Sequence, residues 1–314
     1  MTIESGDLVT LAVVTEPSSP LEEAPAGLAG TRTRLFLKRE DLHELGAFKW
    51  RGAVPALLGY RQRGAEAFVT ASTGNHGAAS AWAARRTGMM AIVYVPTGAS
   101  RSKLALLEGL GADVRQAGAD LDEAKDLART CAERQGLPFF EDGAEPAQFD
   151  GYAAMGRELV EQLGERPAQT VVPVGNGALL IGVARGLGGR GAVGVVAKEA
   201  PVMALSVAAG RPVESERSAT FADGMAVRVA VPLAVRELVK LGSPFVQVSE
   251  RAIARAVGAF AAAGLKVEGA AAAALAALDH LEPPDGATVI IVTGRNIDDE
   301  LHRRAVEAPE SFPG

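Results

Sequence analysis

The stretch AFVTASTGNHGAASAWAARRTGMMAIVYVP, residues 67–96, decides the fold class. Its two ends, 67–72 and 91–96, are short runs rich in β-branched and aromatic residues, which predict buried strands. The alanine-rich middle predicts a helix, and Gly74 and Gly88 lie near its two ends. A strand, a helix and a second strand in this order are typical of a parallel sheet in an α/β protein.

Similar blocks follow this stretch toward the C-terminus. Helices and short strands alternate over 102–141, after which a polar connection at 141–151 leads into a second α/β region. Its buried strands include TVVPV at 170–174 and TVIIVTG at 288–294. The alanine-rich helix at 269–278 is expected to pack tightly in the core. Both regions therefore predict mainly parallel sheets flanked by helices.

Length and composition narrow the class of protein. A chain of 314 residues corresponds to about two domains, and 48% hydrophobic and 22% charged residues are typical of globular proteins. The net charge of −6 argues against nucleic acid as a partner, because no basic field attracts phosphates. The single Cys131, the acidic opening segment and apolar runs shorter than about 18 residues predict a cytoplasmic chain without disulfides or membrane spans.

The segment LKREDLHELGAFKWRGA, residues 37–53, places a lysine among apolar residues. Lys49 lies between Phe48 and Trp50, and lysine is much rarer than arginine in this chain. Apolar surroundings favour the neutral amine, which is the form that attacks an aldehyde. Lys49 is therefore a candidate for covalent catalysis. The alternative is a lysine that extends from a helix toward solvent.

The loop TASTGNHGAAS, residues 70–80, joins a predicted strand to a predicted helix. Hydroxyls, a flexible glycine and an amide precede the helix, where backbone N–H groups favour an anion such as a carboxylate. An ordinary Ser/Thr/Asn helix cap is the alternative. His76 is one of four histidines, and no pair of them has the spacing of zinc ligands, so no metal site is predicted.

A second junction of this kind, VVPVGNGALLIG, spans residues 171–182. Gly175 and Gly177 would let the backbone approach a phosphate closely, while the start of the following helix supplies N–H donors. Leu180 stands where a dinucleotide-binding loop has its third glycine, although Glu199 ends the next strand at a distance suited to a ribose contact. A phosphate site is therefore predicted, with a nicotinamide site as the alternative.

Together these segments resemble the fold-type II pyridoxal 5′-phosphate enzymes, which include threonine and serine dehydratases, serine racemase and threonine synthase. The resemblance covers 35–298 and implies a tryptophan synthase β-like α/β fold, with two three-layer α/β/α domains and mainly parallel sheets. It implies a large cofactor-binding domain of 1–66 plus 145–314 and a small, mobile substrate-binding domain of 67–144. A homodimer is expected from the resemblance alone.

The resemblance assigns roles to the residues that match the family's motifs. Lys49 in AFKWRGA is expected to carry the cofactor and to act in catalysis, with Phe48 packed beside the cofactor ring. Thr73 is expected to act as an acid or base, or only to orient the substrate carboxylate; Asn75 would bind the pyridine 3′-oxygen and Thr293 would face the pyridine nitrogen. The expected substrate loop comprises Ser72, Thr73, Gly74, Asn75 and His76. The other expected cofactor contacts are Gly175, Asn176, Gly177, Ala178, Leu179 and Gly224.

Departures from the family's motifs leave the reaction open. Asn176 and Ala178 interrupt a tetraglycine loop. The GNG loop and STGN resemble threonine synthase, whereas KRED, GNH and ADG resemble the dehydratases. Arg295 replaces a glycine and could pair with an acidic or phosphorylated substrate group, or with Asp298 or Asp299.

The resemblance implies a lyase of amino-acid metabolism. It would eliminate the β-hydroxyl of L-threonine, L-serine or a related hydroxy amino acid to give a 2-oxoacid and ammonia, with the released Lys49 amine removing the Cα proton. The alternatives are a threonine synthase-like reaction on O-phosphohomoserine, serine racemase-like activity and a nicotinamide oxidoreductase. A non-catalytic binding protein on this scaffold would lack the lysine, which this chain keeps. Glu199 has no convincing second acidic ligand nearby in the sequence, so no activating cation is predicted.

Overall fold

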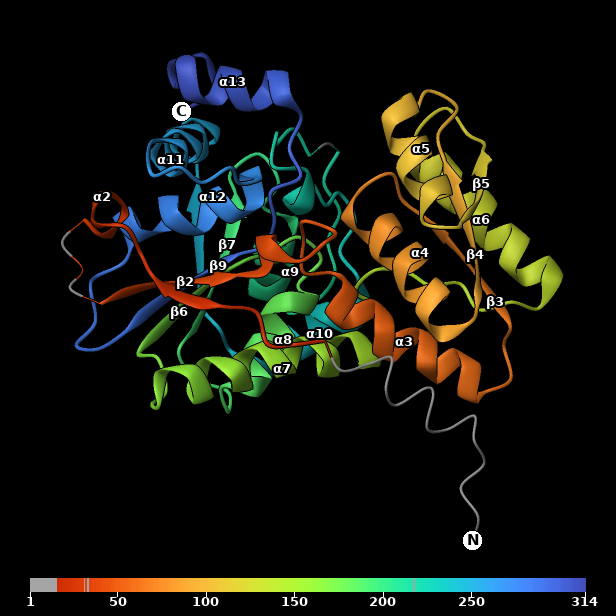
Figure 1. The fold of residues 1–314 in the computed structure, drawn as a ribbon, viewed down its shortest axis with the longest axis horizontal. Helices are drawn as coiled ribbons and strands as arrows, with labels where there is room; N and C mark the ends of the chain where they lie inside the picture. The colour runs from red at the N-terminus through yellow and green to blue at the C-terminus, as the bar shows by residue number, and fades with distance from the viewer. Residues whose placement is uncertain (1–15, 31, 33, 217) are drawn as a thin grey trace, which may run out of the picture. The chain divides into compact units, whose positions relative to one another are not determined.

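The computed structural model describes residues 16–30, 32, 34–216 and 218–314 (Figure 1). These residues form two compact units. The smaller unit comprises Lys49–Gly151 together with 16–18, and the larger unit comprises Ser19–Phe48 and Tyr152–Gly314. No helix in the described ranges is long and apolar enough to cross a membrane.

The smaller unit is built on a three-stranded parallel sheet with the order β3-β4-β5. Two of its helices, α4 and α6, lie on opposite faces of this sheet, and α3 packs along α4 (Figure 1). Helices α4 and α6 end at left-handed glycines, Gly88 and Gly136, a conformation that costs glycine little. The strands are β3 (Ala67–Ala71), β4 (Met90–Val95) and β5 (Asp113–Gln116). The helices are α3 (Trp50–Gln62), α4 (Asn75–Thr87), α5 (Arg101–Gly109) and α6 (Leu121–Gln135).

The larger unit is built on a six-stranded sheet with the order β1-β2-β9-β6-β7-β8. Its strands are parallel except for β1, a three-residue edge strand that pairs antiparallel with β2. The strands are β1 (Leu21–Glu23), β2 (Leu35–Arg39), β6 (Gln169–Pro173), β7 (Ala192–Ala197), β8 (Phe245–Val248) and β9 (Thr288–Val292).

Helices and short 3₁₀ turns complete this unit. Helix α7 (Pro146–Leu163) contains the boundary between the two units, which falls after Gly151. The remaining helices are α2 (Ala26–Ala29), α8 (Ala178–Gly186), α9 (Val202–Ala209), α10 (Pro232–Leu241), α11 (Glu250–Ala262), α12 (Gly269–Ala276) and α13 (Asp299–Glu307). The 3₁₀ turns are η1 (Glu40–Leu42), η2 (Asp223–Met225), η3 (Ala277–His280) and η4 (Pro309–Ser311).

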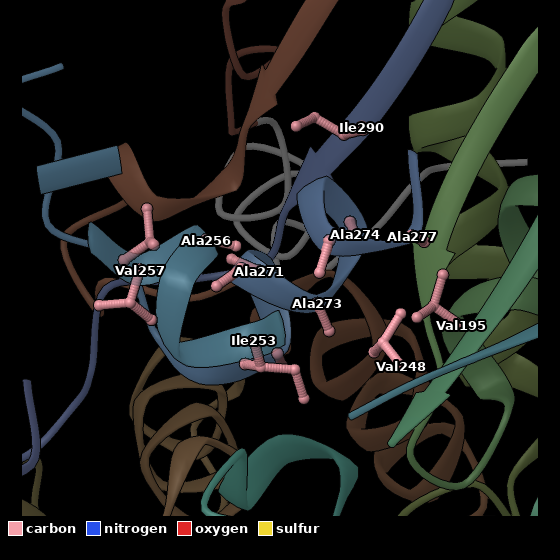
Figure 2. Close-up of a cluster of buried hydrophobic side chains, with 14 of the residues drawn as sticks. Val195, Val248, Ile253, Ala256, Val257, Ala271, Ala273, Ala274, Ala277 and Ile290 are labelled. Carbon is pink, nitrogen blue, oxygen red and sulfur yellow. The ribbon is translucent and has the colours of Figure 1, made fainter. Parts of the chain in front are cut away.

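The core of the larger unit forms where α11 and α12 pack beside the sheet (Figure 2). Helix α12 carries almost only alanine, and Ala271, Ala273 and Ala274 are fully buried. Methyl side chains let this helix approach β6 and β9 closely, while Ile253 and Val257 of α11 fill the space on its other side. The sequence prediction of a tightly packed alanine-rich helix is confirmed.

The architecture agrees with the predicted α/β fold with mainly parallel sheets. The compact smaller unit begins at Lys49, whereas the predicted small domain began at residue 67. Helix α3 groups with the smaller unit because it packs along α4, where the rings of Trp50 and Trp82 lie 6.1 Å apart. The first turns of α7 also approach α3 closely. Gly151 makes this possible because it lacks a side chain, and a Cβ there would lie 2.0 Å from the carbonyl oxygen of Arg51.

Candidate active site

Lys49 occupies the N-cap position of α3, immediately before the first helical residue. Its amine donates a hydrogen bond to Oδ2 of Asp142, and the two side chains are 15% and 21% exposed. The sequence led us to expect an ammonium held against apolar surface. The structure instead gives this mostly buried lysine a carboxylate partner, so the charge that burial would penalise is paired.

Asp142 follows the short segment at 138–140 in a turn before α7, within the stretch predicted as a connection. Its Oδ1 accepts a hydrogen bond of 3.1 Å from Nε2 of Gln148, and Oε1 of Gln148 accepts one of 2.8 Å from the N–H of Gly143. Burial alone would raise the pKa of the Asp142 carboxyl, but the charges of Lys49 and His76 hold it well below its usual range. The carboxyl is therefore charged at neutral pH.

The sequence contains a signal for Asp142, because this residue directly follows a short segment predicted to be a strand. Phe139 forms a parallel bridge with Val69 of β3, so the chain after Phe139 leaves the sheet at the same edge as the loop after β3. Carboxyl ends of parallel strands share one edge, where ligand sites of α/β proteins gather. An acidic residue directly after this short strand was therefore a candidate site residue.

His76 lies in the first turn of α4 and is buried. Its Nδ1 is 3.7 Å from Oδ1 of Asp142, while its Nε2 lies 3.0 Å from Oγ1 of Thr70 and 3.3 Å from the carbonyl oxygen of Phe140. Burial lowers the pKa of the imidazole, and the opposing effect of Asp142 does not restore it. The structure thus brings His76 together with Asp142 and Lys49, a grouping that the sequence analysis did not foresee.

The rest of the expected substrate loop, Ser72–Gly74, joins β3 to α4, and Asn75 is the first residue of the helix. The N–H of Gly74 donates to Oγ of Ser72 at 3.1 Å. Gly74 occupies the N-cap position and carries no side chain, so the cap is not the ordinary Ser, Thr or Asn cap considered as the alternative. Such a helix start presents backbone N–H groups, which suit a carboxylate.

Gly77 explains how this loop can turn so tightly. A Cβ at this position would lie 2.6 Å from the carbonyl oxygen of Ser72, so only glycine lets the first turn of α4 approach the loop.

The expected phosphate loop lies between β6 and α8 in the larger unit. Gly177 is the N-cap residue of α8 with φ of 94°, a left-handed conformation that favours glycine. The N–H of Ala178 donates to Oδ1 of Asn176 at 3.0 Å. A Cβ on Gly175 would lie 2.3 Å from the carbonyl oxygen of Gly224. The backbones of these two expected cofactor residues therefore lie too close together for a side chain to fit between them. Leu179 follows in the first turn of α8 and is buried.

Thr293 lies directly after β9 and is 1% exposed. Its hydroxyl donates a hydrogen bond of 2.8 Å to Oε1 of Glu268, which is 6% exposed. The carbonyl oxygen of Thr293 accepts a 3.1 Å hydrogen bond from the N–H of Phe48, whose ring packs 5.2 Å from that of Tyr152. The larger unit therefore places Phe48 beside Thr293, as expected of two cofactor residues, and adds Glu268, which the sequence analysis missed.

Arg295 does not pair with Asp298 or Asp299. Its guanidinium donates to the carbonyl oxygen of Asp41, and its N–H donates to that of Gly46 at 2.9 Å. Asp298 caps α13, and Asp299 pairs with a lysine at 2.6 Å. The predicted salt bridge to these aspartates is therefore wrong, because both carboxylates have other partners and a backbone carbonyl holds Arg295.

Comparison with known proteins gives the family of this chain. Residues 15–294 match the model of the family described as pyridoxal-phosphate dependent enzyme. The chain belongs to this family. The expected cofactor is therefore confirmed, and so is the expected fold-type II class.

Individual members of the pyridoxal-phosphate dependent enzyme family cover most of the chain. An L-threonine ammonia-lyase of Thermotoga maritima is 33% identical over 300 residues, which are 92% of this chain and 72% of the relative. The solved structure of processed threonine deaminase isoform 2 from Solanum lycopersicum is 27% identical, with a TM-score of 0.87 over 96% of this chain and 92% of its own. A maize serine racemase structure, 23% identical with a TM-score of 0.82, covers 96% of this chain and 95% of its own and shows the same fold.

The residues of this pyridoxal-phosphate dependent enzyme fit their cofactor. Lys49 would supply the amine for the aldehyde. The loop at Gly175–Leu179 offers a helix N-terminus, where backbone N–H groups favour a phosphate, and has glycine at positions 175 and 177. The nicotinamide alternative rested only on this strand, loop and helix. Because the family binds pyridoxal phosphate, these elements no longer support a dinucleotide site.

Proposed function

We propose that this enzyme eliminates the β-hydroxyl of L-threonine, L-serine or a related hydroxy amino acid and yields a 2-oxoacid and ammonia. The observation that carries the proposal is the mostly buried amine of Lys49 at the start of α3, in the unit that also contains the Ser72–His76 loop. Similarity to an L-threonine ammonia-lyase over 92% of the chain supports the same reaction.

The cofactor contacts follow from the residues described above. Lys49 would bind the aldehyde, the loop at Gly175–Leu179 would hold the phosphate, and Phe48 and Gly224 would border the ring, with Asn75 at the ring oxygen. When bound, pyridoxal phosphate withdraws electrons from the substrate's Cα, so that the Cα proton becomes acidic.

The side chains of this protein then move the protons. The amine of Lys49, once released by the substrate, accepts the Cα proton, and the β-hydroxyl leaves with a proton as water. Backbone N–H groups at the start of α4, with the Ser72–His76 loop, hold the substrate carboxylate. One water molecule is then consumed when the dehydrated product hydrolyses to the 2-oxoacid and ammonia, so water balances over the reaction.

Thr293 is proposed to face the pyridine nitrogen. Its hydroxyl proton is directed to Glu268 at 2.8 Å, so the threonine oxygen keeps its lone pairs for a further contact. Because the threonine oxygen could then only accept a hydrogen bond, a contact with the ring nitrogen would require that nitrogen to carry a proton.

The test begins with Lys49. Borohydride reduction of the protein supplied with pyridoxal phosphate, followed by peptide mapping, is expected to label Lys49. Lys49→Ala should lower ammonia release from L-threonine or L-serine by at least about 10³-fold, since both covalent attachment and proton transfer are lost. The exposed Lys198→Ala is the matched control and should retain activity. An unlabelled Lys49 or an active Lys49→Ala variant would overturn the proposal.

One substrate panel separates the other reactions. L- and D-serine, L-threonine, L-threo-3-hydroxyaspartate and O-phosphohomoserine should be assayed for ammonia, oxoacid, phosphate and inverted amino acid. Phosphate release would point to the threonine synthase-like reaction, and D-serine formed from L-serine to racemisation, with Thr73 as the opposite-face acid or base. The guanidinium of Arg295 contacts the Asp41 carbonyl, so it gives no support to a phosphorylated substrate.

A cytoplasmic homodimer, expected from sequence and resemblance, is tested by light scattering and by fractionation of the source cells.

A further inference from the structure

Four residues of the smaller unit form a cluster, and of these only Lys49 is a proposed cofactor contact. Lys49 precedes α3, His76 begins α4, Asp142 lies in the turn before α7, and Gln148 lies in the first turns of α7. Asp142 is the centre of the cluster because each of the other three side chains lies against its carboxylate.

Gln148 fixes the orientation of the Asp142 carboxylate by a hydrogen bond to its Oδ1. Gln148 is 1% exposed, and its amide bridges Oδ1 of Asp142 at 3.1 Å and the N–H of Gly143 at 2.8 Å. This bridge orients the second oxygen, Oδ2, toward the amine of Lys49. A buried amide that is bonded at both ends holds the carboxylate in one orientation.

The charges around Asp142 leave Lys49 as its main counter-ion. Besides Lys49, the titratable side chain that faces Asp142 is His76 of α4, and Lys125 of α6 acts on His76. Burial lowers the pKa of His76, which disfavours its cationic form, whereas the pKa of Asp142 lies well below its usual range. The amine of Lys49 is therefore the partner that this carboxylate meets at hydrogen-bond distance.

The geometry points to Asp142 as the positioning residue that holds the Lys49 nitrogen in one direction. A fixed carboxylate at hydrogen-bond distance stabilises an ammonium and disfavours the neutral amine. The nitrogen that must reach an aldehyde is thus aligned before the cofactor binds, and its nucleophilic form is released only when this hydrogen bond breaks. The role in catalysis rests on the proposed function of Lys49, but the contact itself belongs to the chain without cofactor.

The test measures Lys49 in the full chain stripped of cofactor. Reductive methylation with formaldehyde and a cyanoborohydride, quantified by peptide mass spectrometry across a pH series, gives the pH at which this amine becomes reactive. Asp142→Asn is expected to lower the midpoint by about one unit or more, which is about tenfold faster labelling below the midpoint. Gln148→Ala keeps the carboxylate but removes its support, and should shift the midpoint in the same direction by less.

Glu141→Gln is the matched control. The neighbouring Glu141 pairs with Lys125 and, at 3.2 Å, with Arg129 on α6, so its substitution should leave the Lys49 midpoint unchanged. The inference is overturned if Asp142→Asn keeps the wild-type midpoint, or if Glu141→Gln shifts it as much. Should Asp142→Asn fail to fold, an unchanged midpoint in Gln148→Ala overturns the inference instead. Because labelling needs no pyridoxal phosphate, its outcome is independent of the borohydride test of the proposed function.

Discussion

At the scale of single residues, the candidate site depends on contacts between side chains that are distant in sequence. Lys49 and Asp142 are 93 positions apart, and Thr293 and Glu268 are 25 apart. Each pair places a carboxylate against a group with an expected role at the cofactor. The carboxylates therefore fix the direction of these groups.

The contact between Thr293 and Glu268 gives a prediction about stability. Thr293→Val keeps the shape of the side chain but removes the donor to the buried Oε1 of Glu268, which should lower the free energy of unfolding by about 1–3 kcal/mol. Urea denaturation of the cofactor-free protein measures this loss. Thr130→Val, on the exposed face of α6, should change stability by no more than about 0.5 kcal/mol. Equal losses in both variants would contradict the assigned contact.

At the scale of elements, the two expected ligand loops share one construction, in which a parallel strand is followed by a glycine at the N-cap of a helix. Gly74 starts α4 and Gly177 starts α8. Both loops therefore present backbone N–H groups at a helix start, where a carboxylate or a phosphate is favoured. Glycine at the N-cap of α4 also removes the side chain that would otherwise accept those N–H groups, whereas at α8 the neighbouring Asn176 accepts the N–H of Ala178.

The loop before α8 predicts an effect on cofactor affinity. In Gly175→Ala the new methyl group would lie 2.3 Å from the Gly224 carbonyl oxygen, so one of the two segments must move. We expect a loss of about 1–3 kcal/mol in stability and weaker binding of pyridoxal phosphate, measured by denaturation and by equilibrium titration.

The control for this variant is Gly109→Ala at the end of α5. No atom lies within 4 Å of a Cβ at Gly109, so the substitution should leave cofactor affinity unchanged and could add up to about 1 kcal/mol of stability. Unchanged affinity in Gly175→Ala would show that the close approach to Gly224 does not shape the binding loop.

At the scale of the whole molecule, the fold is two α/β units, each with a mainly parallel sheet. Buried ionisable groups link the stability of such a fold to pH. The lowered pKa of buried His76 means that the unfolded chain binds a proton more readily than the native chain does. The native state should therefore lose stability as pH falls below the unfolded histidine pKa of about 6.5. Asp142 adds a loss only below its unfolded pKa of about 4, since its native pKa is lowered.

Unfolding free energies at pH 7 and pH 5 test this dependence. The native protein should lose up to about 1.4 kcal/mol per pH unit through His76 once pH is below 6.5, and His76→Asn should reduce that slope. The exposed His280→Asn is the control and should keep the native slope. The comparison concerns the slope, because His76→Asn also loses contacts with Thr70 and Phe140 that act at every pH.

Local pattern was enough to predict much of the fold and part of the site. The strand and helix on either side of the 72–74 loop, the junction at 175–177 and the buried alanine helix are all encoded in short runs, so periodicity and glycine spacing revealed them. The edge strand β1 was missed because its three residues, Leu21–Glu23, contain no alternation to detect. Glu268 was missed because its significance lies in a tertiary contact with Thr293, which local spacing does not report. Asp142 was missed although it directly follows the short segment at 138–140, whose end lies at the ligand-binding edge of a parallel sheet.

The close packing of α12 also limits how this enzyme can evolve. Its alanines lie against strands on one side and α11 on the other, so a larger side chain at a fully buried position would have to displace a neighbour. A saturation library selected for growth should accept only small residues at the fully buried positions of this helix, such as Ala271, Ala273 and Ala274. New substrate preferences must then arise in the loops, while the alanine helix stays unchanged.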